Sequence, residues 1–232
     1  MEETPEHWDE CWRSTSVGYP HETTIAAIQE LDAESVLEVG AGSGRDLEEL
    51  QSLGYRVGFS DISSEAVRRF GAHNPGSFAL RVDARNLPLA DNSFDLVMSL
   101  GVLEHFDRAE RGNILREQFR VARRYVLVDV PQKWAPATFI TKALNAIGAW
   151  SHGDESPFAY RDLIREVREE TKTKRVVSVY GRELVPLPRN IKGRFYSRLP
   201  SPVRRRYVQL QKHLAWGLAG CTGIVFEKSV AD

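Results

Sequence analysis

The sequence has few cysteines and no long apolar run, and these absences exclude several classes of protein. Its 232 residues include only two cysteines, Cys11 and Cys221, whose spacing does not resemble that of metal ligands. We therefore expect a reducing compartment and no metal site. No apolar run approaches the roughly twenty residues that span a bilayer, and the acidic start lacks the apolar segment of a secretory signal. The sequence thus predicts a cytoplasmic protein with no transmembrane segment.

The sequence also lacks a large net charge of either sign. The formal net charge is −1, with 42% hydrophobic and 27% charged residues, which fits a single α/β domain over residues 1–232 and argues against a general nucleic-acid binder. The charge is uneven, however. Residues 1–34 contain nine Asp or Glu but only Arg13, and residues 182–214 contain nine Lys or Arg but only Glu183. Solvated faces explain most runs of this kind, and ligand recognition is the alternative.

The chain is organised around a glycine-rich segment at residues 35–45. The β-branched run Val36–Val39 leads into three alternating glycines and then a helix-forming stretch, Asp46–Leu53; the glycines are Gly40, Gly42 and Gly44. Glycines allow positive φ and let a ligand lie against the backbone, and the following helix offers unpaired N–H groups. Arg45 occupies the place of the third glycine of the dinucleotide pattern G-x-G-x-x-G, so the loop points away from NAD.

Strand-like and helix-like segments alternate through the rest of the chain. Strands are predicted at residues 36–39, 55–60, 78–82, 94–100, 125–130, 175–180 and 223–228, and helices at 23–31, 46–53, 63–70, 104–122 and 160–171. This alternation predicts a doubly wound, mostly parallel seven-stranded sheet with helices on both faces.

The same reading divides the domain into parts. Residues 1–34 are expected to form an irregular or short-helical lid with Trp8, Trp12 and Tyr19 as anchors, and residues 35–131 the ligand-binding core. Residues 132–172 and 185–216 read as helical insertions that cover the site. Ligands of such sheets bind beyond the carboxyl ends of the strands, so we expect the site there.

Carboxylates stand at or near three of these strand ends. Asp61, seventeen residues after Gly44, is placed to accept the hydroxyls of a ribose. Asp83 closes the third strand and is placed to accept the exocyclic amine of an adenine, with the N–H of Ala84 on a ring nitrogen. Glu38 is then the carboxylate that could hold the positively charged amino-acid end of the ligand. A ligand with an adenine, a ribose and a cationic amino-acid end is S-adenosylmethionine. The alternatives are structural: a helix cap at Asp61, an Asx turn at Asp83, and bonds from Glu38 to loop amides.

The successive motifs resemble those of class I S-adenosylmethionine-dependent methyltransferases, in particular the small-molecule branch that includes quinone and sterol methyltransferases. They are Val36–Gly44, Asp61, Asp83–Ala84, Phe94–Val97 and Val102–His105, and they cover about residues 34–131. The resemblance implies a Rossmann-like methyltransferase fold and S-adenosylmethionine as cofactor. It further implies that the glycines shape the methionine pocket and that Leu100 offers its carbonyl to the ligand ammonium. Ala41 and Ile62 fall within the same motifs and belong to the predicted cofactor site.

Methyl transfer from a sulfonium requires alignment of the acceptor more than covalent catalysis. A base is needed only where the acceptor holds its proton tightly. His105 is the leading candidate for that base, and packing at a helix start is the alternative. His152, Asp154, Glu155 and Tyr160 are weaker candidates in the cover segment.

Two further features bear on the acceptor. The apolar stripe of Phe139–Trp150 is either core packing, an acceptor wall or a peripheral membrane contact. The basic residues around Arg204–Arg206, with Arg194, Arg198 and Lys212, are either solvated or recognise an anionic group. The predicted partner is a small acceptor, apolar or amphiphilic with an anionic head. An RNA-modifying methyltransferase and a non-catalytic S-adenosylmethionine-binding regulator are the alternative functions.

Overall fold

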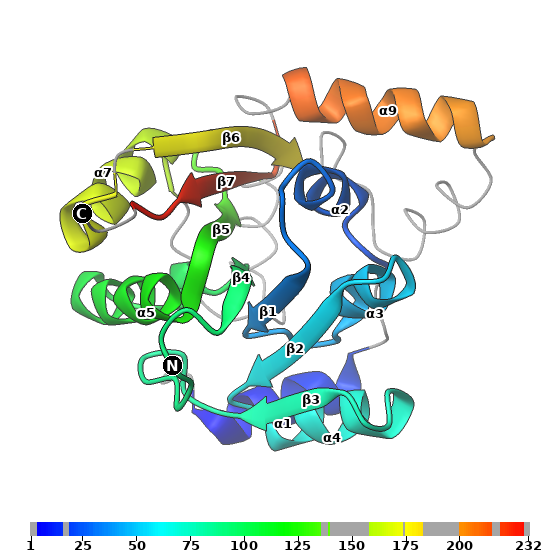
Figure 1. Cartoon of the computed structure of the whole chain (residues 1–232), viewed down its shortest axis with the longest axis vertical. Coiled ribbons are helices and arrows are strands. Elements are labelled where there is room, and N and C mark those ends of the chain that lie inside the picture. Colours follow the sequence, from blue (N-terminus) through cyan, green and yellow to red (C-terminus); the bar gives the residue numbers. More distant parts are fainter. Residues whose placement is uncertain are drawn as a thin grey trace.

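A seven-stranded sheet forms the centre of the molecule (Figure 1). The computed structural model describes residues 4–15, 19–135, 139, 158–173, 175–182, 200–214 and 219–229. The strand order is β3-β2-β1-β4-β5-β7-β6, and β7 alone runs antiparallel to its neighbours. The strands are β1 (Ser35–Val39), β2 (Arg56–Asp61), β3 (Phe78–Arg81), β4 (Phe94–Leu100), β5 (Ala122–Pro131), β6 (Arg175–Arg182) and β7 (Cys221–Glu227). The prediction of a mostly parallel seven-stranded sheet is confirmed.

Helices cover both faces of the sheet. They are α1 (Pro5–Ser14), α2 (Glu22–Ile28), α3 (Arg45–Ser52), α4 (Ser64–His73), the 3₁₀ turn η1 (Leu103–His105), α5 (Arg108–Val121), α7 (Tyr160–Thr171) and α9 (Ser201–Leu214). Helices α3 and α4 pack on one side and α5 with α7 on the other, while α1 lies on α4 and α9 on β6 and α2. The chain therefore winds in both directions from β1, and β1 and β4 flank the point where it reverses.

Alternation along β1 decides which side of the sheet each of its side chains faces. Leu37 and Val39 belong to the core beneath α5 and α7, whereas Val36 belongs to the core beneath α2, α3 and α4. Since successive strand residues point to opposite faces, Glu38 shares the face of Val36. Glu38 is thereby directed toward the start of α3 rather than toward α5.

The helix expected over residues 104–122 is wrong at its start. The turn η1 ends at His105, and α5 begins only after Asp107, whose side chain accepts the N–H of Glu110 at 2.9 Å. The Glu110 carboxylate in turn accepts the N–H of Asp107, which completes a capping box. This cap explains the break, because Asp107 must adopt an extended conformation to make it. His105 therefore lies in a turn at the carboxyl end of β4, separate from α5.

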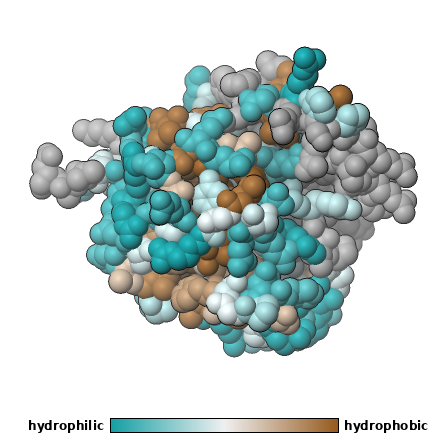
Figure 2. Space-filling view, turned by 45° about the vertical axis from the view of Figure 1, so that its right-hand side comes forward, coloured by the Kyte–Doolittle hydropathy of each residue, from teal (hydrophilic) through white to brown (hydrophobic). Residues whose placement is uncertain are grey.

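The visible surface is mainly polar. Figure 2 shows hydrophilic residues over most of the face it presents, with hydrophobic residues in small groups. Within the described ranges, no helix is long and apolar enough to cross a membrane. The same ranges contain no group of three or more His, Cys, Asp or Glu arranged to hold a metal ion.

Candidate functional site

The glycine-rich loop joins β1 to α3 through three residues in the left-handed region. Gly40, Gly42 and Gly44 have φ of 68°, 53° and 69°, which side-chain-bearing residues rarely adopt. The N–H of Gly42 donates to the Asp61 carboxylate at 2.8 Å, and the N–H of Ala41 donates to the carbonyl of Ser60 at 3.0 Å. The end of β2 thus fixes the loop; the sequence predicted the positive φ of the glycines but not these bonds.

Glu38 carries a buried carboxylate oxygen that no hydrogen bond satisfies. The residue is 3% exposed, and its Oε2 has no partner in the structure. Burial, reinforced by the nearby carboxylates of Asp46 and Asp61, raises the pKa of Glu38 well above its usual value, although Arg182 opposes this. An unsatisfied buried acceptor costs free energy. The site is therefore built to receive a hydrogen-bond donor or a cation at this point.

Asp46, the second residue of α3, is held by His21 at the start of α2. The backbone N–H of His21 donates to one carboxylate oxygen at 2.6 Å, and its ring Nδ1 lies 2.7 Å from the other. Burial opposes the charged form, but His21 and Arg182 hold the pKa of Asp46 below its usual value. Of the adjacent acids Glu38 and Asp46, Glu38 is therefore the one that takes up a proton more readily.

A second buried pair lies at the same edge of the sheet. Arg182, the last residue of β6, donates to Asp129 of β5 through NH2 at 2.7 Å and through Nε at 3.2 Å. Asp129 is in register with Leu100 of β4, and its carbonyl accepts the N–H of Gly101 at 2.9 Å. Arg182 is thus the cation that partly balances Glu38 and Asp46.

Asp61 and Asp83 lie in contrasting environments. Asp61 is 6% exposed and accepts the N–H groups of Gly42 and Ser63, one on each oxygen; burial raises its pKa although these bonds oppose the rise. Asp83 is partly exposed and makes a two-point ion pair with Arg85, which lowers the pKa of Asp83. Its Oδ1 also accepts the N–H of Arg85, so the Asx turn considered above is present. Each oxygen of Asp61 thus keeps a lone pair, whereas Arg85 makes two contacts with each oxygen of Asp83.

Helix α1 lies over the glycine-rich loop. A Cβ placed on Gly42 would collide with the indole of Trp12, and the ring of Trp8 meets His105 edge-on with centroids 5.1 Å apart. Asp9 accepts from the Ser63 hydroxyl at 2.6 Å and the N–H of Glu65 at 3.0 Å, and these bonds lower the pKa of Asp9 to about 2. Residues 5–14 are therefore helical, and Trp8 and Trp12 act as anchors.

The comparisons with known proteins agree with this geometry. Residues 37–127 match the family model described as "Methyltransferase domain". Over these residues the chain resembles methyltransferases. It is 34% identical over 113 residues to a demethylmenaquinone methyltransferase of Thermobifida fusca (45% of this chain, 46% of that protein). It is 30% identical over 159 residues to one of Beutenbergia cavernae (63% of each). The matched part thus spans roughly half to two thirds of these relatives.

Solved structures support the fold of the methyltransferase domain. A SAM-dependent methyltransferase of Thermotoga maritima, titled a possible histamine N-methyltransferase, aligns with a TM-score of 0.66 at 18% identity, covering 97% of this chain and 94% of that one. A magnesium protoporphyrin IX methyltransferase of Synechocystis PCC 6803 with bound SAH aligns with a TM-score of 0.58 at 16% identity, covering 90% and 81%. At these identities the likeness concerns the fold alone. The predicted resemblance to class I methyltransferases is confirmed.

The methyltransferase domain brings several predicted site residues to one edge of the sheet. Glu38, the glycines and Asp61 lie together, Leu100 ends β4, and Ile62 follows β2, where its carbonyl accepts from Arg81 at 3.1 Å. Asp83 and Ala84 follow β3, next in the sheet to β2. The assignment of each to the cofactor stays a prediction.

Other expectations fare differently. Tyr19 is 59% exposed, so its prediction as an anchor is wrong. Tyr160 begins α7, where its hydroxyl accepts from Arg161. His152, Asp154, Glu155, Arg194 and Arg198 lie outside the described residues. So does the apolar stripe of residues 139–150, except for Phe139, which is 59% exposed.

Sequence reasoning missed His21, Asp46, Asp129 and Arg182. The pairs lie 25 and 53 residues apart in the chain, and neither spacing is a known motif. The one usable signal in the sequence was the position of two of these residues relative to the ends of strands. Asp129 lies near the end of a strand and Arg182 at the end of another, as Glu38 and Asp61 do.

Proposed function

We propose that this protein is an S-adenosylmethionine-dependent methyltransferase that acts on a small lipophilic acceptor of the quinone type. One observation carries the first half of the proposal. The buried, unpartnered oxygen of Glu38 lies at the carboxyl end of β1, directly before a loop of three left-handed glycines. A cationic ligand with a slender chain fits such a place, since its ammonium would satisfy the carboxylate and its chain would lie on bare backbone.

The described residues fit this cofactor along its length. Glu38 and the carbonyl of Leu100 would hold the ammonium, and the glycine-rich loop would support the methionine chain. Asp61 has spare lone pairs for the ribose hydroxyls while it continues to bind Gly42. Asp83 would accept an adenine amine in exchange for part of its contact with Arg85.

S-adenosylmethionine, when bound, supplies a methyl group already activated on a sulfonium. The protein's part is to hold the acceptor in line with that methyl and to exclude water. Trp8 and Trp12 on α1 serve the second purpose, because they cover the loop and His105. His105, in the turn that follows β4, would accept the proton that the acceptor carbon loses.

The acceptor class rests on the two curated relatives, whose names state that they methylate demethylmenaquinone. Trp134, three residues after β5 ends, is 66% exposed and offers an aromatic surface. A flat aromatic ring can stack on such a side chain. The reduced, electron-rich form, demethylmenaquinol, is the form whose ring carbon can attack a methyl group and then release its proton.

The test has two stages. Calorimetry with S-adenosylmethionine and with its demethylated product should give saturable one-to-one binding. Incubation with radiolabelled S-adenosylmethionine and a short-chain demethylmenaquinol should transfer label to the quinone. Binding without transfer to quinone, to total RNA or to a small-molecule extract would favour the regulator. Transfer to RNA alone would favour the RNA-modifying enzyme, and absence of binding to the folded protein would refute the proposal.

Cofactor binding should strengthen as the pH rises and should release protons. Below its raised pKa the unliganded Glu38 is protonated, whereas an ammonium favours the carboxylate form. Of the charged groups that face it, Asp46 and Asp61 raise the pKa of Glu38 further and Arg182 lowers it. Calorimetry in phosphate and in Tris, at pH values below the raised pKa of Glu38, should therefore give different heats, since the buffer takes up the proton. Glu38→Gln should remove the difference; equal heats for the wild-type protein would contradict the assignment.

A further inference from the structure

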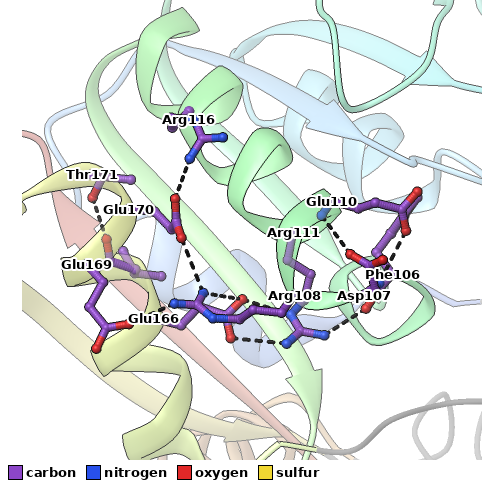
Figure 3. Close-up of polar contacts among 11 residues, drawn as sticks. Phe106, Asp107, Arg108, Glu110, Arg111, Arg116, Glu166, Glu169, Glu170 and Thr171 are labelled. Carbon is purple, nitrogen blue, oxygen red and sulfur yellow. Dashed lines mark hydrogen bonds and ion pairs between the residues drawn. The ribbon is translucent and has the colours of Figure 1, made fainter.

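Arg111 of α5 makes contacts with three separate segments of the chain, and Figure 3 shows its contacts with Phe106 and Glu166. Its Nε and NH2 donate to the Glu166 carboxylate of α7 at 2.8 and 3.3 Å. Its NH1 donates to the carbonyl of Phe106 at 2.7 Å, and its guanidinium carbon lies 4.9 Å from the centroid of the Phe158 ring. The Arg111 side chain is only 14% exposed. One guanidinium thus joins the end of η1, the segment before α7, and α7 itself.

Two of these segments lie where the acceptor is expected. Phe106 directly follows His105 and ends η1. Phe158 pairs with the end of β5: its N–H donates to the carbonyl of Pro131 at 2.9 Å, and its carbonyl accepts the N–H of Lys133 at 2.8 Å. Both segments therefore leave the carboxyl edge of the sheet beside each other, and Arg111 lies against both.

An arginine is required for this set of contacts. Its planar fork can donate to a carboxylate through two nitrogens, to a carbonyl through the third, and still stack on an aromatic ring. A lysine ammonium could replace one of the polar contacts but not all three. The contact to Phe106 is a charge-assisted hydrogen bond in a largely buried place, so it limits the movement of the η1 backbone.

Other ion pairs already hold α7 on α5. Arg108 pairs with Glu166 at 3.0 Å and with Glu169 at 2.7 Å, and Arg116 pairs with Glu170 (Figure 3). Neither arginine has a contact to Phe106 or Phe158 among those found for the described residues. The pairing of α5 with α7 thus rests on several ion pairs, whereas Arg111 is the one of these three arginines that bonds the Phe106 carbonyl among the described residues. The Phe106 ring has a second contact, with Arg85, whose guanidinium carbon lies 5.8 Å from the ring centroid.

We propose that Arg111 is a positioning residue that locks the segment carrying His105 to the segment leading into α7, so that both walls of the acceptor site keep one arrangement. The inference deepens the function proposed above and rests on it for the role of the site. The link itself, however, is a property of the unliganded protein and can be measured without any acceptor.

The test compares Arg111→Met and Arg111→Lys with the matched control Arg116→Met, which removes an α5–α7 ion pair alone. Hydrogen exchange followed by mass spectrometry on the unliganded protein is the primary measurement. Arg111→Met should speed exchange by about tenfold in residues 102–107 and 158–162, because both segments lose their common tie. Arg111→Lys should speed it in residues 102–107 only. Arg116→Met should leave both segments unchanged.

The second measurement separates positioning from general stability. Affinity for S-adenosylhomocysteine should stay within about twofold of wild type in all three variants, since the hydrogen bonds of Arg111 and Arg116 within the described residues include no side chain assigned to the cofactor. With demethylmenaquinol, kcat of Arg111→Met should fall by about tenfold or more through misalignment. Unchanged exchange at residues 102–107 in Arg111→Met would overturn the proposal even if the protein methylates quinols. Failure to methylate quinols, with the exchange pattern as expected, would count against the proposed function alone.

Discussion

Glu38→Gln is expected to weaken S-adenosylmethionine binding by about 10- to 100-fold, because a hydrogen bond to a charged group contributes roughly 1.5–3 kcal/mol. The same change should stabilise the unliganded protein at neutral pH. The pKa of Glu38 is raised in the folded state, so its contribution to stability is present at low pH and is lost as the pH rises through that value. Glutamine keeps the shape without the charge. Affinity and stability should therefore move in opposite directions, measured by calorimetry and by thermal unfolding.

The gain in stability should vanish near pH 4, where glutamate is protonated in the unfolded chain as well. Glu49→Gln is the matched control, since Glu49 lies on the exposed face of α3, close in sequence but away from the site. It should change neither quantity appreciably. A Glu38→Gln protein that is less stable than wild type and binds the cofactor normally would mean that Glu38 supports the loop rather than the ligand.

The sequence predicted the side of the site formed by strand ends. Parallel strands bring their carboxyl ends to one edge, so the positions of Glu38, Asp61 and Asp83 followed from the places where apolar runs stop. The left-handed conformation of the three glycines could be predicted in the same way, because glycine adopts positive φ without the steric cost that other residues incur. These signals lie within short stretches of neighbouring residues. For that reason, β1 and the loop after it could be predicted correctly from the sequence.

The partners of those residues could not be predicted. The pairing of Asp46 with His21 depends on α2 beginning beside α3, and that of Asp129 with Arg182 depends on β6 returning parallel to β5 across β7. Neither of these spatial arrangements produces a periodic pattern in the sequence. The break before α5 was missed for a different reason. The capping box of Asp107 and Glu110 was readable, but the helical pattern was extended through it.

Gly42→Ala should produce the largest combined loss of stability and of cofactor binding. At φ of 53° an alanine costs about 1–2 kcal/mol in backbone strain. Its Cβ would also enter the space of the Trp12 indole, and overpacking of this kind adds about 1–3 kcal/mol. Helix α1 must then move off the loop. We expect a lower free energy of unfolding in urea, a changed Trp fluorescence spectrum and cofactor affinity at least about tenfold weaker.

Two controls separate the causes of that loss. Gly76→Ala suffers the strain without the collision, since Gly76 has φ of 85° and nothing lies within 4 Å of its added Cβ. Combining Gly42→Ala with Trp12→Ala removes the collision partner, so the stability cost of the glycine change should shrink to the strain alone in a double-mutant cycle. Cofactor affinity should not recover in the double variant, because the added methyl group still stands on the surface where the methionine chain must lie. Recovery of binding would mean that Gly42 matters only because it accommodates Trp12, and the glycine-rich loop would lose its assigned contact with the ligand.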